Sequence, residues 1–174
     1  LDQAGRYDEA LNLLDELLEN DPQNSRYLQA RASTLGSLGK EKEAAVTLDL
    51  LRRMGALKTQ ELVILGDLYH NLTLYHLSLD AYQEALASTQ KLSLSQYIRI
   101  AQTLIQRSSY HEGFSYLEKI EGEFGEGKSK EDRKLIHLLK AEVLQATGKN
   151  QQAAELLREI VNPVSYTHLR AHET

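Results

Sequence analysis

The segment Gly148-Lys149-Asn150-Gln151-Gln152-Ala153 places a glycine five residues before a small residue that opens an apolar run, and Gly5-Arg6-Tyr7-Asp8-Glu9-Ala10 has the same layout. The small residue recurs between these two segments at intervals of 34, 34, 35 and 40 residues. Its positions are Ala10, Ala44, Ser78, Gly113 and Ala153. A period of this size is typical of proteins built from stacked structural repeats.

Large apolar residues follow each small residue after four and after seven positions, which is the spacing of one helix face. They are Leu14, Leu48, Tyr82, Leu117 and Leu157, and then Leu17, Leu51, Ala85, Ile120 and Ile160. Half a unit away, small residues recur at Ala32, Gly66, Ala101 and Ala141, and three positions after each comes a large residue: Leu35, Tyr69, Leu104 and Leu144. Turns are predicted at Gly39, Thr73, Ser108 and Gly148, and also at Gly5. Each unit is therefore predicted to be two helices of about 12–14 residues joined by a tight turn.

The predicted fold class is all-α, an α-solenoid of antiparallel helix pairs, because one such pair cannot bury its apolar stripe without neighbours. We expect an array over residues 1–163 with about four and a half repeats. It begins with a half repeat, 1–24, and continues with 25–58, 59–92, 94–127 and 134–163. The Gly/Glu-rich stretch 121–128 is predicted to be an inserted loop, which accounts for the long last interval.

The repeats resemble those of the tetratricopeptide repeat (TPR) family over residues 1–162. Leu65-Gly66-Asp67-Leu68-Tyr69 matches the family's core of the first helix, and Gly5–Ala10 with Asp21-Pro22 matches its second helix and closing proline. The closing proline is present only at Pro22. The resemblance implies a right-handed superhelix whose concave surface, lined by the first helices, binds protein or peptide partners.

The groove predicted from this register is a mixed polar and apolar face. Its candidate residues are Gln29, Ser33, Val63, Asp67, His70, Ile98, Arg99, Gln102, Leu138 and Glu142. Packing between repeats is an equally weighted interpretation of the apolar members. Relatives that grip a C-terminal carboxylate use cations and Asn at matching places, where only Arg99 fits here, so that role is not expected.

Composition narrows the functional classes for this chain of 174 residues. With no cysteine, thiol nucleophiles and Cys-containing zinc sites are excluded. A net charge of -5 disfavours nucleic acid, because phosphate contacts need clustered Lys and Arg. No catalytic, cofactor-binding or metal-binding constellation is predicted, and no apolar run is long enough to span a membrane.

Both ends of the chain differ from the repeats. The first residues suggest that the native N-terminus is missing, so the compartment is not predicted. Val164–Thr174 corresponds to one reading frame of a transposase sequencing adapter and is interpreted as a non-native tail; a genuine polar tail is the alternative. His168 and His172 therefore carry no metal-site prediction despite their i, i+4 spacing.

The predicted function is a non-enzymatic protein–protein interaction module, a fragment of a larger scaffold or assembly protein. Two alternatives stay open. One is the non-catalytic, substrate-recruiting arm of a larger enzyme, and the other is an RNA-binding helical repeat, which the net charge of -5 disfavours.

Overall fold

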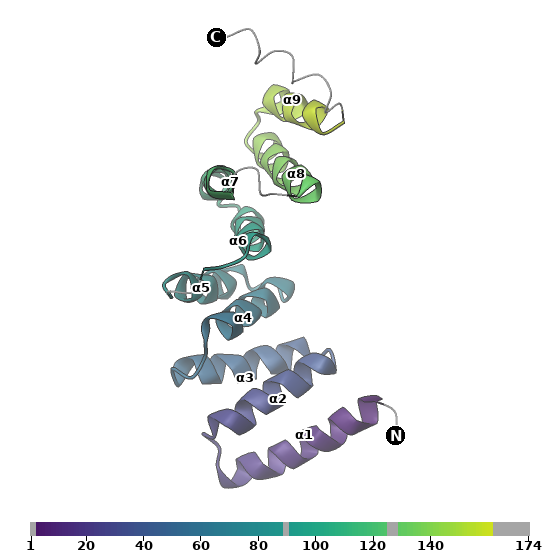
Figure 1. The fold of residues 1–174 in the computed structure, drawn as a ribbon, viewed down its shortest axis with the longest axis vertical. Coiled ribbons are helices and arrows are strands. Elements are labelled where there is room, and N and C mark those ends of the chain that lie inside the picture. Colours follow the sequence, from purple (N-terminus) through teal and green to yellow (C-terminus); the bar gives the residue numbers. More distant parts are fainter. Residues whose placement is uncertain (1–2, 89–90, 125–128, 162–174) are drawn as a thin grey trace. The chain divides into compact units, whose positions relative to one another are not determined.

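The computed structural model describes residues 3–88, 91–124 and 129–161, and these residues form helices and connecting turns without any strand. The helices are α1 (Gln3–Asn20), α2 (Ser25–Ser37), α3 (Glu41–Arg53), α4 (Thr59–Asn71), α5 (Tyr75–Leu86), α6 (Leu94–Gln106), α7 (Tyr110–Phe124), α8 (Lys130–Ala146) and α9 (Asn150–Val161). The all-α prediction is confirmed (Figure 1). The predicted tail, Val164–Thr174, lies outside the described residues.

The chain forms two compact units, Leu1–Lys91 with α1 to α5 and Leu92–Thr174 with α6 to α9. In the first unit each helix contacts the next one along the chain, and α4 and α5 make the most extensive contact. In the second unit α6 contacts both α7 and α8, and α8 also contacts α7 and α9. Stacked helix pairs therefore build each unit, as the solenoid prediction requires.

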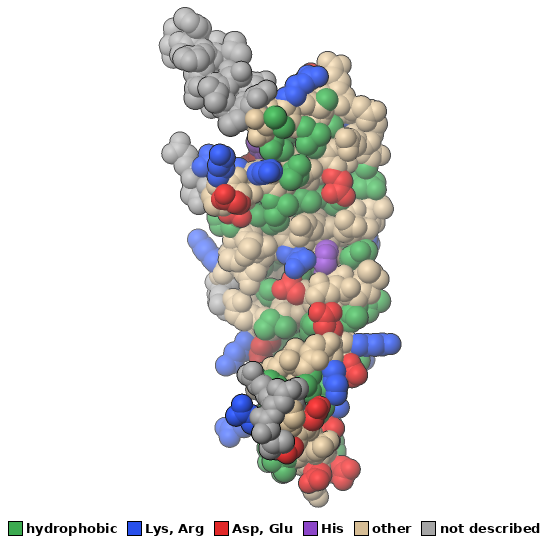
Figure 2. Space-filling model, turned by 90° about the vertical axis from the view of Figure 1, so that its right-hand side faces the viewer, with side chains coloured by type: hydrophobic (Ala, Val, Ile, Leu, Met, Phe, Trp, Pro, Cys, Tyr) green, Lys and Arg blue, Asp and Glu red, His purple; other side chains and the backbone are tan. Residues whose placement is uncertain are grey.

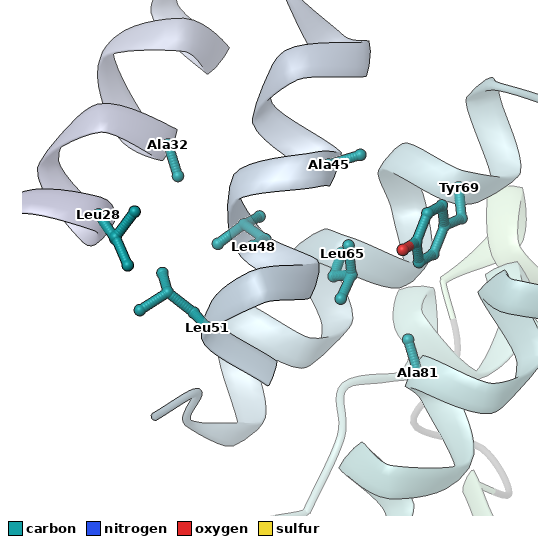
Figure 3. Close-up of a cluster of buried hydrophobic side chains, with 8 residues drawn as sticks. All are labelled: Leu28, Ala32, Ala45, Leu48, Leu51, Leu65, Tyr69 and Ala81. Atoms are coloured by element: carbon teal, nitrogen blue, oxygen red, sulfur yellow. The ribbon is translucent and has the colours of Figure 1, made fainter. Parts of the chain in front are cut away.

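The core of the first unit lies where helices from successive repeats meet. Leu28 of α2 and Leu48 and Leu51 of α3 point toward one another, and Leu65 of α4 lies beside them (Figure 3). The second unit has an equivalent cluster that includes Ile98, Leu117 and Ile136. The small residues predicted at helix crossings are buried: Ala32, Gly66, Ala101 and Ala141.

The predicted turn residues Gly39, Thr73, Ser108 and Gly148 all have positive φ, at 68°, 61°, 66° and 77°. Each closes the same hydrogen-bond pattern. For example, the Thr73 amide donates to the His70 carbonyl at 2.9 Å, and the Leu74 amide donates to the Tyr69 carbonyl at 2.8 Å. This is the Schellman motif, which ends a helix with one left-handed residue. It reverses the chain at each of these four turns.

Replacing Thr73 with glycine is expected to stabilise the protein by about 0.5–1 kcal/mol. A β-branched residue is strained at positive φ, and glycine is not, although glycine adds some entropy to the unfolded chain. Urea unfolding followed by circular dichroism measures the change. The matched control is Gly148→Ala, where a new Cβ meets nothing within 4 Å, so its expected loss of about 1 kcal/mol comes from the backbone alone. A loss of stability in Thr73→Gly would contradict this account.

The helices α6 and α8 each begin with a capping box. Ser93 caps α6, with its amide donating to Gln96 Oε1 at 2.7 Å, and Ser129 caps α8 by accepting from the Asp132 amide at 3.0 Å. Because the cap lies at Ser129, α8 begins at Lys130 and has 17 residues, more than the predicted length.

Two local predictions are wrong. Gly5 lies inside α1, which is a continuous helix of 18 residues; glycine adopts helical φ as readily as positive φ, so glycine alone does not specify a turn. The stretch from residue 121 is not a loop at its start, because α7 continues to Phe124. The Phe124 ring packs edge-on against Tyr97 with centroids 5.6 Å apart, which gives this last turn a tertiary contact. The division into repeats stays a prediction.

Candidate functional site

The candidate groove residues lie on the first helix of each predicted helix pair. In the first unit these helices are α2 and α4. Ser33 on α2 is exposed and Gln29 is half-buried, so both reach the surface. Val63 on α4 is only 3% exposed and is a core residue, so its placement in the groove was wrong. The next residue, Ile64, is 51% exposed and is the apolar side chain that this helix presents to solvent.

Asp67 and His70 of α4 have structural contacts of their own. The Tyr82 hydroxyl of α5 donates to Asp67 Oδ1 at 2.5 Å, so this half-buried carboxylate fastens α5 to α4. The His70 ring lies edge-on to Tyr75 with centroids 5.5 Å apart. Neither residue is therefore available as a simple surface charge, and reversing the charge of Asp67 would disturb packing as well as any partner.

In the second unit the first helices are α6 and α8, which contact each other. Arg99 and Gln102 on α6 are half-buried, Glu142 on α8 is exposed, and Leu138 is 42% exposed. Ile98 is 3% exposed and belongs to the core cluster with Ala101 and Ile136, so its placement in the groove was also wrong. We call Arg99, Gln102, Leu138 and Glu142 the α6–α8 face.

Val63 and Ile98 share one place in the helix register, three residues before the buried small residues Gly66 and Ala101. Leu138 stands three residues before the buried Ala141 as well, yet it is 42% exposed. The spacing alone therefore does not decide whether a side chain at this place is buried. The side chains that pack against each helix in its own unit decide it.

The altered pKa values belong to core tyrosines and not to a reactive site. Burial is the main cause that raises the pKa of Tyr69 to about 12, and the nearby carboxylate of Asp49 adds to the effect. Burial also raises the pKa of Tyr116 well above its usual value, and the hydroxyl of Tyr116 has no hydrogen-bond partner among the described residues. Both phenols stay protonated at neutral pH, so they offer no acid or base chemistry there.

Other site types receive no support within the described ranges. No group of three or more His, Asp or Glu side chains there is arranged to hold a metal ion. None of the described helices is long and apolar enough to cross a membrane. On the face shown in Figure 2, acidic and basic side chains are interspersed with apolar ones.

Solved structures with a similar arrangement of helices identify the fold. A crystal structure of MamA superposes with a TM-score of 0.72 at 16% sequence identity and covers 98% of this chain and 88% of that chain. A crystal structure of YrrB, described as a TPR protein with an unusual peptide-binding site, superposes with a TM-score of 0.74 at 16% identity and covers 98% of this chain and 85% of that chain. The chain has a tetratricopeptide repeat fold.

A second crystal structure of MamA has the same tetratricopeptide arrangement, with a TM-score of 0.69 at 16% identity, and covers 93% of this chain and 94% of that chain. No protein-family model matches the sequence, and a comparison with curated proteins gives no significant match. The likeness at this identity extends to the tetratricopeptide fold, and function has to be argued from the faces themselves.

Proposed function

We propose that this protein is a non-enzymatic interaction module that binds a peptide or a helix of a partner protein along the exposed faces of its first helices. The observation that carries the proposal is the α6–α8 face. It combines an exposed leucine, Leu138, with side chains of both charge signs, Arg99 and Glu142, on two helices in contact. Surfaces that bind proteins combine apolar and polar side chains in this way.

The tetratricopeptide fold supports the same function by analogy, because YrrB is described as having a peptide-binding site. The core does not need this face. Leu117, Ile120 and Ile136, each at most 1% exposed, fill the interior of the second unit, and Leu138 does not belong to that cluster. A change of Leu138 should thus alter partner binding while leaving folding almost unchanged.

Changing Arg99 to glutamate is expected to raise the dissociation constant of a bound peptide at least about five-fold while the helix content stays unchanged. Arginine forms strong charge-assisted hydrogen bonds with carboxylates, and reversing its charge replaces attraction by repulsion. The measurement has two steps. A random peptide library is first selected on the native protein, and the dissociation constants of selected peptides are then compared between native and variant proteins by calorimetry.

Lys119→Glu is the matched control, since it makes the same charge change on α7, where Lys119 pairs with Glu123 at 3.6 Å. Leu138→Ser tests the apolar side chain of this face and should lower the affinity for the same peptides. Equal affinity in native, Arg99→Glu and Leu138→Ser proteins would remove the α6–α8 face from the binding site. Failure of the native protein to select any peptide would count against the proposed function as a whole.

A further inference from the structure

A small apolar cleft in the second unit lies at the edge of the core and opens between the start of α7 and the end of α8. Its volume is about 130 Å³. Its apolar walls are Tyr110 and Phe114 from α7, and Val143 and Leu144 from α8. This volume approaches the ~150 Å³ of an apolar cavity that accepts benzene. The cleft therefore has room for one branched or aromatic side chain.

Two short side chains at the end of α8, Val143 and Thr147, line the cleft. Counted from the turn residues Thr73 and Gly148, the positions of Val143 and Thr147 correspond to Leu68 and Leu72 of α4. Leu68 and Leu72 pack on the core cluster of the first unit. In the second unit valine and threonine stand at these places, and both line the open cleft.

The side chains at the mouth of the cleft are polar, and one of them, Lys149, is a cation. Its remaining lining residues are His111, Thr147 and Lys149. Lys149 and His111 are exposed, and no described lining residue carries a carboxylate. Glu112 follows His111 in α7 and lines an adjoining surface, which shares Tyr110 and His111 with the cleft. An apolar pocket with a cationic rim is complementary to an apolar group that stands beside a negative charge.

We infer that this cleft is an anchor site for a partner peptide in which a phenylalanine or leucine stands next to a glutamate or aspartate. The apolar side chain enters between Phe114 and Val143, and the neighbouring carboxylate pairs with Lys149 at the mouth. This inference rests on the proposed interaction function but not on the α6–α8 face. The cleft is a second contact site for the partner, and it selects an apolar side chain that stands beside a carboxylate.

The test uses the full ¹⁵N-labelled chain and three blocked hexapeptides with the central pairs Phe-Glu, Phe-Gln and Ala-Glu in an otherwise identical Gly/Ser sequence. The Phe-Glu peptide is expected to shift the amide resonances of Tyr110, His111, Thr147 and Lys149 in a saturable way. The Phe-Gln peptide should bind about three- to five-fold more weakly, as expected for the loss of one exposed ion pair. The Ala-Glu peptide should give no saturable shift.

Three variants complete the test. Lys149→Glu should lower the affinity for the Phe-Glu peptide about ten-fold, because it replaces the cation at the mouth by a carboxylate. Lys149→Arg keeps the positive charge and should bind this peptide like the native chain. Thr147→Phe should abolish binding, because the new ring fills the mouth of the cleft. Lys134→Glu is the matched control, since it reverses an exposed lysine on α8, thirteen residues before Thr147. Thirteen residues of helix span about 20 Å, so this variant should bind like the native chain.

Shifts confined to the α6–α8 face would overturn the anchor site and leave the proposed function standing. No saturable shift with the Phe-Glu peptide, or equal affinity for Phe-Glu and Phe-Gln, would also overturn the anchor site. The library selection on the native protein decides separately whether the proposed function fails as well.

Discussion

Replacing Gly66 with alanine is expected to destabilise the protein by about 2–3 kcal/mol, although alanine is normally the better helix former. A Cβ at this position would lie 2.6 Å from Cδ1 and 2.9 Å from Cζ of Tyr82. Tyr82 cannot move aside easily, because its side chain is 1% exposed and its hydroxyl is bound to Asp67. The buried Ser78 hydroxyl, which donates to the Gly66 carbonyl at 2.8 Å, also holds α5 against α4.

The control for Gly66 is Gly36 near the end of α2. An added Cβ there meets nothing within 4 Å, so Gly36→Ala should raise stability by about 0.5–1 kcal/mol. Urea unfolding of both variants gives the two free energies. The free energy of unfolding is expected to fall in Gly66→Ala and to rise in Gly36→Ala, although both variants add one methyl group. An unchanged free energy of unfolding in Gly66→Ala would mean that α4 and α5 do not approach as closely as described.

Replacing Leu117 with alanine is expected to cost about 3–5 kcal/mol, the upper part of the range for buried leucines. Leu117 is fully buried, at 0% exposure, within the core cluster of the second unit. Removing three heavy atoms leaves a cavity that the surrounding rigid helices fill only in part. Chemical denaturation measured in the second unit, by fluorescence of a label or by amide exchange, reports the loss directly.

Leu138→Ala is the matched control, because Leu138 is 42% exposed on the same unit. Its cost should stay below about 1 kcal/mol, since surface substitutions rarely exceed this. Equal losses for Leu117→Ala and Leu138→Ala would place the α6–α8 face in the core and contradict its role in binding.

The candidate site was less predictable than the fold. Leu138 and Glu142 are exposed and Arg99 and Gln102 are half-buried, whereas Val63 and Ile98 are buried. On a helix, a shift of one residue rotates a side chain by about 100°, so a small error in register moves a residue from the surface to the core. The anchor cleft had no sequence signal of its own, because it depends on side-chain volumes from two helices.

By itself, the sequence determined the helical class, the repeating period and the positions of the four turns at Gly39, Thr73, Ser108 and Gly148. These features depend on local spacing and local backbone conformation, which are encoded within a few residues. Only the tertiary structure decided how close two helices come and what fills the space between them. Gly113 illustrates the difference, because a Cβ there would lie 2.9 Å from Cγ1 of Ile105 on the neighbouring helix. That contact joins residues of different helices, and close packing sets it through the volumes of both partners.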